Sequence, residues 1–125
     1  MASQMEEVAK QFTEFYYNTF DSGRTNLAAL YRNSSMLTFE GQQFLGAPQI
    51  TEKLVSLPFQ KVAHKVSTYD VQPSNTQGNS IMVLVTGQLL IDEESNPQQF
   101  SQTFQLCNDN GNWYVQNDIF RLNYA

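Results

Sequence analysis

Apolar residues recur at helical spacing over the first twenty positions of the chain, and polar residues fill the places between them. The apolar positions are Met5, Val8, Phe12, Phe15 and Phe20. Ser3 followed three residues later by Glu6 is the pattern of a capping box, which marks the start of a helix. The sequence therefore predicts an amphipathic helix from Ser3 to about Asp21, whose aromatic stripe needs a sheet to cover it.

Two more helices are predicted in the first half of the chain. Thr25 can cap a short second helix that runs through Tyr31. Pro48 suits the first turn of a third helix that ends near Ser56. Short strands are predicted between these two helices, at residues 36–39 and 43–45.

From residue 61 onward the pattern is typical of strands alone. Long strands are predicted at residues 61–72, 80–91, 98–107 and 112–122, with turn-rich stretches between them. Helices followed by a meander of strands indicate an α+β fold with the helices on one face of an antiparallel sheet. No compositionally biased segment resembles a linker, so residues 1–125 are expected to form a single domain.

The strand predicted at residues 80–91 carries apolar side chains on both faces. One face has Ile81, Val83, Val85, Leu89 and Ile91, and the other has Met82, Leu84 and Leu90. The helices can cover only one of these faces. We therefore expect a homodimer that covers the second face, although a loop of the same chain could also do so.

Acidic residues outnumber basic ones by 12 to 7, and the excess lies entirely after residue 65. An acidic surface repels phosphate backbones and anionic lipids, so neither nucleic acid nor membrane is an expected partner, whereas a basic protein surface is. The lone Cys107 cannot form an internal disulfide, which fits a reducing compartment. The N-terminus shows no secretory signal, and the expected location is the cytosol or the nucleus.

Few side chains in the sequence suggest metal or cofactor chemistry. His64 is the only histidine, Cys107 reads as a packing residue, and no phosphate loop or nucleophile motif is present, so no metal or cofactor is predicted. One constellation combines acids and His64 with aromatic residues around the cavity expected under a curved sheet. Its members are Glu40, His64, Asp92, Glu94, Asp118, Phe39, Phe59, Phe100, Phe104 and Phe120. It could serve acid/base catalysis, with His64 and Asp118 as the candidate pair, or recognition, and residues 92–94 could also be a solvated loop.

Five segments in order along the chain resemble the nuclear transport factor 2 family, most closely its fungal form. They are FTEFYYNTFD at residues 12–21, LTFEGQQF at 37–44, EKLVSLPFQK at 52–61, GQLLIDEE at 87–94 and NDIFRL at 117–122. The resemblance implies a cone-like curved sheet with three helices on its concave face, an apolar cavity, and a homodimer formed through the sheet. Other members of this superfold are dehydratases and isomerases, or dimerisation modules of other transport proteins.

The resemblance also implies a function. Family members are carriers, not enzymes, that bind the GDP form of the small GTPase Ran and phenylalanine-glycine repeats of nucleoporins, and they gather at nuclear pores between cytoplasm and nucleus. By position, Phe39, Glu40, His64, Asp92 and Glu94 match the Ran-binding residues. Phe39 stands where animal members carry tryptophan, and Glu94 is a longer carboxylate than the usual aspartate.

Five other positions match the repeat-binding surface of the family. They are Met5, Gln72, Pro73, Ile119 and Phe120. Ile119 and Phe120 could instead serve mainly to pack the dimer. Met5 stands where an aromatic residue is usual, which keeps an apolar, adaptable surface but removes a ring for stacking. Weaker binding of nucleoporin repeats is the expected consequence.

Overall fold

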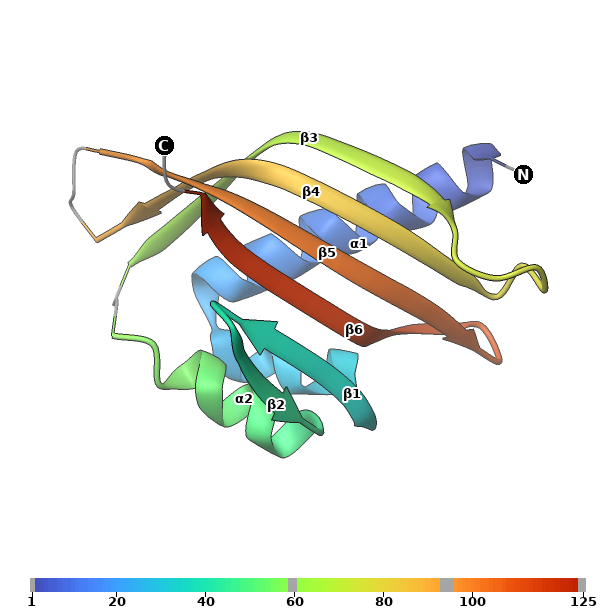
Figure 1. The fold of residues 1–125 in the computed structure, drawn as a ribbon, viewed down its shortest axis with the longest axis horizontal. Helices are drawn as coiled ribbons and strands as arrows, with labels where there is room; N and C mark the ends of the chain where they lie inside the picture. Colours follow the sequence, from blue (N-terminus) through green and yellow to red (C-terminus); the bar gives the residue numbers. More distant parts are fainter. Residues whose placement is uncertain (1, 59–60, 93–95, 124–125) are drawn as a thin grey trace.

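The computed structural model describes residues 2–58, 61–92 and 96–123, and within them it contains three helices and six strands. The strands form one curved sheet, and helix α1 runs along one face of it (Figure 1). In chain order the elements are α1 (Ala2–Ser22), the 3-10 helix η1 (Arg24–Leu30), β1 (Tyr31–Phe39), β2 (Gln42–Leu45), α2 (Ala47–Val55), β3 (Val62–Pro73), β4 (Ser80–Ile91), β5 (Gln98–Asp109) and β6 (Asn112–Asn123).

The α+β class with helices beside a curved sheet is confirmed, but the sheet is mixed rather than wholly antiparallel. The strand order is β2-β1-β6-β5-β4-β3, and β1 pairs with β6 in parallel. A tight turn forces antiparallel pairing only on strands that follow one another in the chain. Since β1 and β6 come from opposite ends of the sequence, no such turn constrains their direction.

Helix α1 packs its aromatic side chains onto the inner face of the sheet. Tyr16 is 1% exposed and Phe12 8%, and the Phe104 ring of β5 lies edge-on to both, at 4.8 Å and 5.2 Å. The prediction that Phe15 belongs to this stripe is wrong, since Phe15 is 54% exposed. Spacing of three and four residues from Phe12 through Tyr16 to Phe20 leaves Phe15 beside the buried stripe.

The second helix is more tightly wound than an α-helix and is capped at a different residue than predicted. It is a 3-10 helix whose N-cap is Gly23, and Thr25 lies inside it and makes no cap hydrogen bond. The backbone N–H of Gly23 donates to the Thr19 carbonyl, which ends α1 directly before η1 begins. With α1 ending so close, the chain turns at Gly23 and the position of the cap moves two residues upstream of Thr25.

Strand β1 begins five residues earlier than predicted because distant groups satisfy its polar first half. Between Tyr31 and Met36 the register of the pairing with β6 shifts, which marks a bulge in β1. The buried Ser35 hydroxyl donates to the Val115 carbonyl at 2.5 Å and accepts the Arg32 N–H at 2.8 Å. The bulge therefore has internal partners that its own sequence does not reveal.

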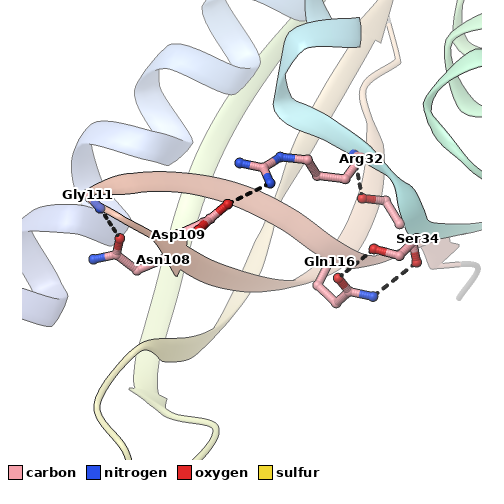
Figure 2. A network of polar contacts seen from close by, with 7 residues as sticks. Arg32, Ser34, Asn108, Asp109, Gly111 and Gln116 are labelled. Atoms are coloured by element: carbon pink, nitrogen blue, oxygen red, sulfur yellow. Dashed lines mark hydrogen bonds and ion pairs between the residues drawn. The ribbon is translucent and has the colours of Figure 1, made fainter.

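Side chains from β5 and β6 hold the outer side of this bulge (Figure 2). The Gln116 amide donates to the Ser34 carbonyl at 3.0 Å, and the Arg32 guanidinium pairs with Asp109 at 3.0 Å. The same guanidinium lies 4.2 Å from the centre of the Tyr114 ring. Together these contacts fix β1 against the β5–β6 hairpin.

None of the helices in the described part of the chain has the combined length and apolarity needed to cross a membrane.

Candidate partner-binding site

A small apolar cavity of about 80 Å³ lies between the inner face of the sheet and the helices. Phe39, Leu37 and Phe120 line it from β1 and β6, and Leu89 and Ile91 line it from β4. Its polar lining residues are His64, Tyr16 and Gln102, which come from β3, α1 and β5. The cavity is thus assembled from elements that span almost the whole chain.

Two stacked aromatic rings, Phe39 and Phe120, form one wall of this cavity, and the buried ring of Phe100 extends the stack behind the wall. Phe39 and Phe120 are nearly parallel, with ring centres 4.8 Å apart and planes 8° apart. The ring of Phe100 continues the stack 5.6 Å beyond Phe120. Register explains the arrangement, because Phe39 sits opposite Phe120 across the parallel β1–β6 pair. The wall favours an aromatic or aliphatic guest.

Two acids lie at the ends of strands that line the cavity. Glu40 directly follows Phe39 in the tight β1–β2 turn, and Asp92 directly follows Ile91 at the end of β4. The Glu40 carboxylate accepts the Leu122 N–H, and the Asp92 carboxylate accepts the Lys61 N–H at 2.8 Å. These backbone contacts hold both carboxylates beside residues of the cavity wall.

Both acids also have left-handed backbone conformations, with φ of 51° at Glu40 and 53° at Asp92. Such values are uncommon for residues other than glycine and asparagine, and each costs on the order of 1 kcal/mol or more. Gly41, with φ of 85°, completes a two-residue turn that suits glycine at this position. Strained backbone conformations cluster at functional sites, so two acids in such conformations next to a cavity mark a candidate binding site.

Two predicted residues cannot be placed, because Glu94 and Phe59 lie outside the described residues.

His64 lines the cavity with a fixed ring. Its side chain is 2% exposed, and its Nδ1–H donates to the Asp21 carboxylate at 2.6 Å. The second oxygen of Asp21 accepts the His64 backbone N–H at 3.0 Å, so the carboxylate holds both the ring and the backbone of His64. The rings of Tyr17 and Phe20 pack against the imidazole, with centres 4.6 Å and 4.8 Å away.

Asp118 is fully buried behind the cavity wall, among other partners. Its carboxylate accepts hydrogen bonds from Tyr31 at 2.7 Å, from Gln102 at 2.8 Å and from Tyr16 at 3.4 Å. Burial raises the pKa of Asp118 from 3.8 to about 6, and the three donors partly offset this rise. Burial also raises the pKa of the Tyr16 and Tyr31 hydroxyls.

The two members of the candidate catalytic pair are engaged separately. His64 is held by Asp21, whereas Asp118 is held by Gln102 and the tyrosines. The proton-transfer pair considered from the sequence is therefore not assembled in this cavity. No group of three or more metal-ligating side chains occurs among the residues described here either.

The positions matched to the repeat-binding surface lie in three different places. Met5 and Pro73 line a groove of about 720 Å³ at the first turns of α1. Gln72 and Ile119 lie on the outer face of the sheet, where Ile119 is 49% exposed. Phe120 is 5% exposed and belongs to the cavity wall, on the opposite face from Ile119.

Sequence reasoning missed three residues of the site: Asp21, Tyr16 and Gln102. The sequence indicates Asp21 only as the approximate end of the first helix, and its partner His64 lies 43 positions away. Tyr16 and Gln102 are buried polar residues that both donate hydrogen bonds to Asp118, and Tyr17 donates to Gln102 at 2.7 Å. A tyrosine pair at positions 16 and 17 within an apolar stripe is the one local signal that could have indicated buried hydroxyls.

The fold and the site define a small α+β protein that encloses an apolar cavity flanked by acids, a class suited to gripping a partner's side chain. The chain belongs to the nuclear transport factor 2 family, since the profile described as "Nuclear transport factor 2 (NTF2) domain" matches residues 8–122. Proteins called nuclear transport factor 2 are similar over nearly the whole chain.

The similar protein from Candida albicans is 60% identical over 125 residues, all of this chain and all of its own. The one from Schizosaccharomyces pombe is 61% identical over 118 residues, or 94% of this chain and 95% of its own. A solved structure of nuclear transport factor 2 from Cryptosporidium parvum has a TM-score of 0.89 at 43% identity, and covers 96% of this chain and 95% of that one. This family places the chain among nuclear transport carriers rather than among the enzymes that share the fold.

Proposed function

We propose that this chain carries the small GTPase Ran, in its GDP form, into the nucleus. An apolar side chain of Ran enters the cavity beside Phe39 and His64, and basic Ran residues pair with Glu40 and Asp92. The observation that carries this proposal is the pair of acids held at positive φ, each next to a residue of an apolar cavity wall. Opposite charges around a buried apolar anchor give both affinity and orientation.

The cavity must widen when the guest enters. Its volume of about 80 Å³ is smaller than the roughly 150 Å³ apolar cavity that admits benzene. Burying one phenylalanine contributes roughly 1.5–3 kcal/mol, and each charge-assisted hydrogen bond contributes about as much. One anchor and two ion pairs are compatible with roughly micromolar affinity after the entropy of association is subtracted.

Calorimetric titration with Ran loaded with GDP or with GTP tests the proposal. We expect binding to the GDP form only, without nucleotide turnover. Glu40→Lys should abolish the binding, because it reverses the charge beside the cavity, whereas Glu14→Lys on the exposed side of α1 should not. Equal affinity for both nucleotide forms, or no affinity for either, would sink the proposal.

We further propose that the carrier binds phenylalanine-glycine repeats of nucleoporins and so gathers at the nuclear pores. Met5 and Pro73 support this assignment because they line one groove together. Repeats must be released quickly, and a shallow groove used many times gives weak individual contacts with sufficient total affinity. Ile119 and Gln72 contribute in this proposal only where a second copy brings their face near the groove.

A homodimer formed through the outer face of the sheet completes the proposal. Leu84 of β4, Thr103 of β5 and Ile119 of β6 are aligned across adjacent strands on that face. Leu84 and Ile119 are 42% and 49% exposed, and Met82 on the same strand as Leu84 is 41% exposed. Such an apolar row favours a second copy as its cover. Sedimentation should show a dimer that Leu84→Lys converts to a monomer; a wild-type monomer at micromolar concentration would refute this part.

A further inference from the structure

The groove at the start of α1 contains the only tryptophan of the chain. Trp113, from the first residues of β6, lines this groove together with Met5 and Val8 of α1 and Pro73 at the end of β3. The groove thus brings together three elements, α1, β3 and β6, that lie far apart in the sequence. Trp113, Met5 and Val8 are partly buried and pack against the core, which holds the walls of the groove in place.

We infer that Trp113 is the aromatic wall of the repeat-binding groove, and that it receives the phenylalanine ring of an uncharged phenylalanine-glycine segment. This inference rests on the proposed nucleoporin binding and assigns it a residue. Met5 has no ring to stack on a phenylalanine, although its sulfur can contact a ring edge. Trp113 supplies the missing ring from another element, and paired aromatic rings gain affinity beyond the area they bury.

Charge separates this groove from the cavity. Among the described residues that line the groove, Glu7 is the one charged side chain, and the other polar residues, including Gln4, Asn75 and Asn108, are uncharged. The cavity, in contrast, is flanked by Glu40 and Asp92. A basic partner is therefore drawn to the cavity, whereas an uncharged segment meets few unpaired charges in the groove.

The groove and the cavity also differ in volume, and this difference favours the same assignment of partners. The groove measures about 720 Å³, against about 80 Å³ for the cavity. Volumes of roughly 300–1,000 Å³ are usual for sites that hold a whole small ligand. The groove can thus take an aromatic side chain together with its flanking backbone, whereas the cavity admits at most a single side chain.

Because Trp113 is the only tryptophan, its fluorescence reports on the groove without a label. The probe is a synthetic peptide with two phenylalanine-glycine repeats joined by serine and glutamine, which contains no tryptophan. Titration should shift the Trp113 emission in a saturable manner, and the same peptide with serine in place of phenylalanine should not. Calorimetry should give the same dissociation constant as the fluorescence.

Variants then test the ring itself. Trp113→Ala should weaken peptide binding about tenfold, and Trp113→Phe should restore most of it, while both keep the affinity for Ran-GDP. The matched control is Tyr114→Ala, which removes the neighbouring ring that packs on Arg32 and not in the groove. This control should bind the peptide as the wild type does.

The outcomes separate the inference from the proposed function. If the peptide binds by calorimetry but leaves the emission unchanged, or if Trp113→Ala binds as tightly as Tyr114→Ala, the role of Trp113 is refuted and nucleoporin binding stands. If the wild type binds no repeat peptide, the proposed repeat binding fails and the inference fails with it. If circular dichroism shows that Trp113→Ala does not fold, two other measurements test the role of Trp113. A peptide-induced shift of the wild-type emission and near-normal peptide affinity of Trp113→Phe would support it, and the absence of the shift would refute it.

Discussion

Asp118 is a buried carboxylate, 1% exposed, that ionises near pH 6, and its replacement by asparagine tests how its charge affects stability. Asparagine has nearly the same shape and stays neutral at every pH. It keeps one acceptor oxygen for Tyr31 but presents an amide where the carboxylate accepted Gln102. A constant penalty from this mismatch is expected, on the order of 1–3 kcal/mol.

The pH-dependent part of the effect follows from the raised pKa. Between pH 3.8, the value for the unfolded chain, and about pH 6, the folded protein keeps a proton on Asp118 that the unfolded chain has lost. This proton stabilises the folded state fully below pH 3.8, and the contribution is lost as the pH rises through 6. At about 1.4 kcal/mol per pKa unit, the loss amounts to about 3 kcal/mol.

Urea denaturation at pH 4, 5, 6 and 7, at one protein concentration, measures the effect. The difference in unfolding free energy between wild type and Asp118→Asn should move by roughly 2.5 kcal/mol toward the variant from pH 4 to pH 7, because at pH 4 most of the full effect is already present. Glu14→Gln, which removes an exposed carboxylate from α1, gives the background to be subtracted. A difference that stays constant across this range would refute the assigned titration of Asp118.

Three further substitutions test other contacts. Asp21→Asn should lower the affinity for Ran-GDP about three- to tenfold, because it weakens the hydrogen bond that orients the His64 ring. An unchanged dissociation constant by calorimetry would show that this hydrogen bond does not contribute to binding. Gly87→Ala should destabilise the fold by about 1–3 kcal/mol in urea, since its Cβ would lie 2.3 Å from a backbone oxygen of β3, and a stable variant would contradict this packing. Arg32→Ala should change the unfolding free energy by less than about 1 kcal/mol, because its ion pair with Asp109 is half exposed; a larger loss would show that the bulge depends on it.

Elements with strong local signals could be predicted from the sequence. Strand β4 has the predicted bounds, Ser80–Ile91, because apolar residues run between two turn-rich stretches. Helix α1 spans Ala2–Ser22, so it ends one residue beyond the predicted Asp21. The capping box predicted at Ser3 is wrong, because Ser3 lies inside the helix. The long apolar stripe predicts the helix itself, whereas its first residue depends on the cap. For such elements the pattern of buried side chains and the local preference agree, and tertiary contacts add little information.

Features that depend on distant partners could not be predicted. Nothing near Arg32 or Ser34 indicates a strand, and the groups that satisfy this stretch lie about eighty positions away. In the same way, the burial of Tyr16 depends on Asp118, 102 positions along the chain. Local sequence patterns predict that a polar residue is exposed, because they do not reveal a distant hydrogen-bond partner. They therefore predict fewer buried polar residues than the structure contains.

The candidate site shows the same division. Phe39, Glu40 and Asp92 are predicted at the cavity from the grouping of acids and aromatics and from the family resemblance, and in the structure Phe39 lines the cavity and each acid directly follows a lining residue. Which aromatic rings line the cavity and which line the groove could be learned only from the three-dimensional structure. Phe120 and Trp113 both belong to β6, but Phe120 lines the cavity and Trp113 lines the groove at the start of α1.

Helix α1 connects the two proposed sites and also keeps them apart. Met5 lines the groove and Phe20 lines the cavity, and fifteen residues of helix separate them by about 22 Å. Among the described residues, none lines both hollows. A carrier has to hold its cargo while it contacts the pore, so occupation of one site should leave the other free. Equal affinity for repeat peptide with and without bound Ran-GDP is the expected result, and strong coupling between the two would mean that α1 moves when the cavity fills.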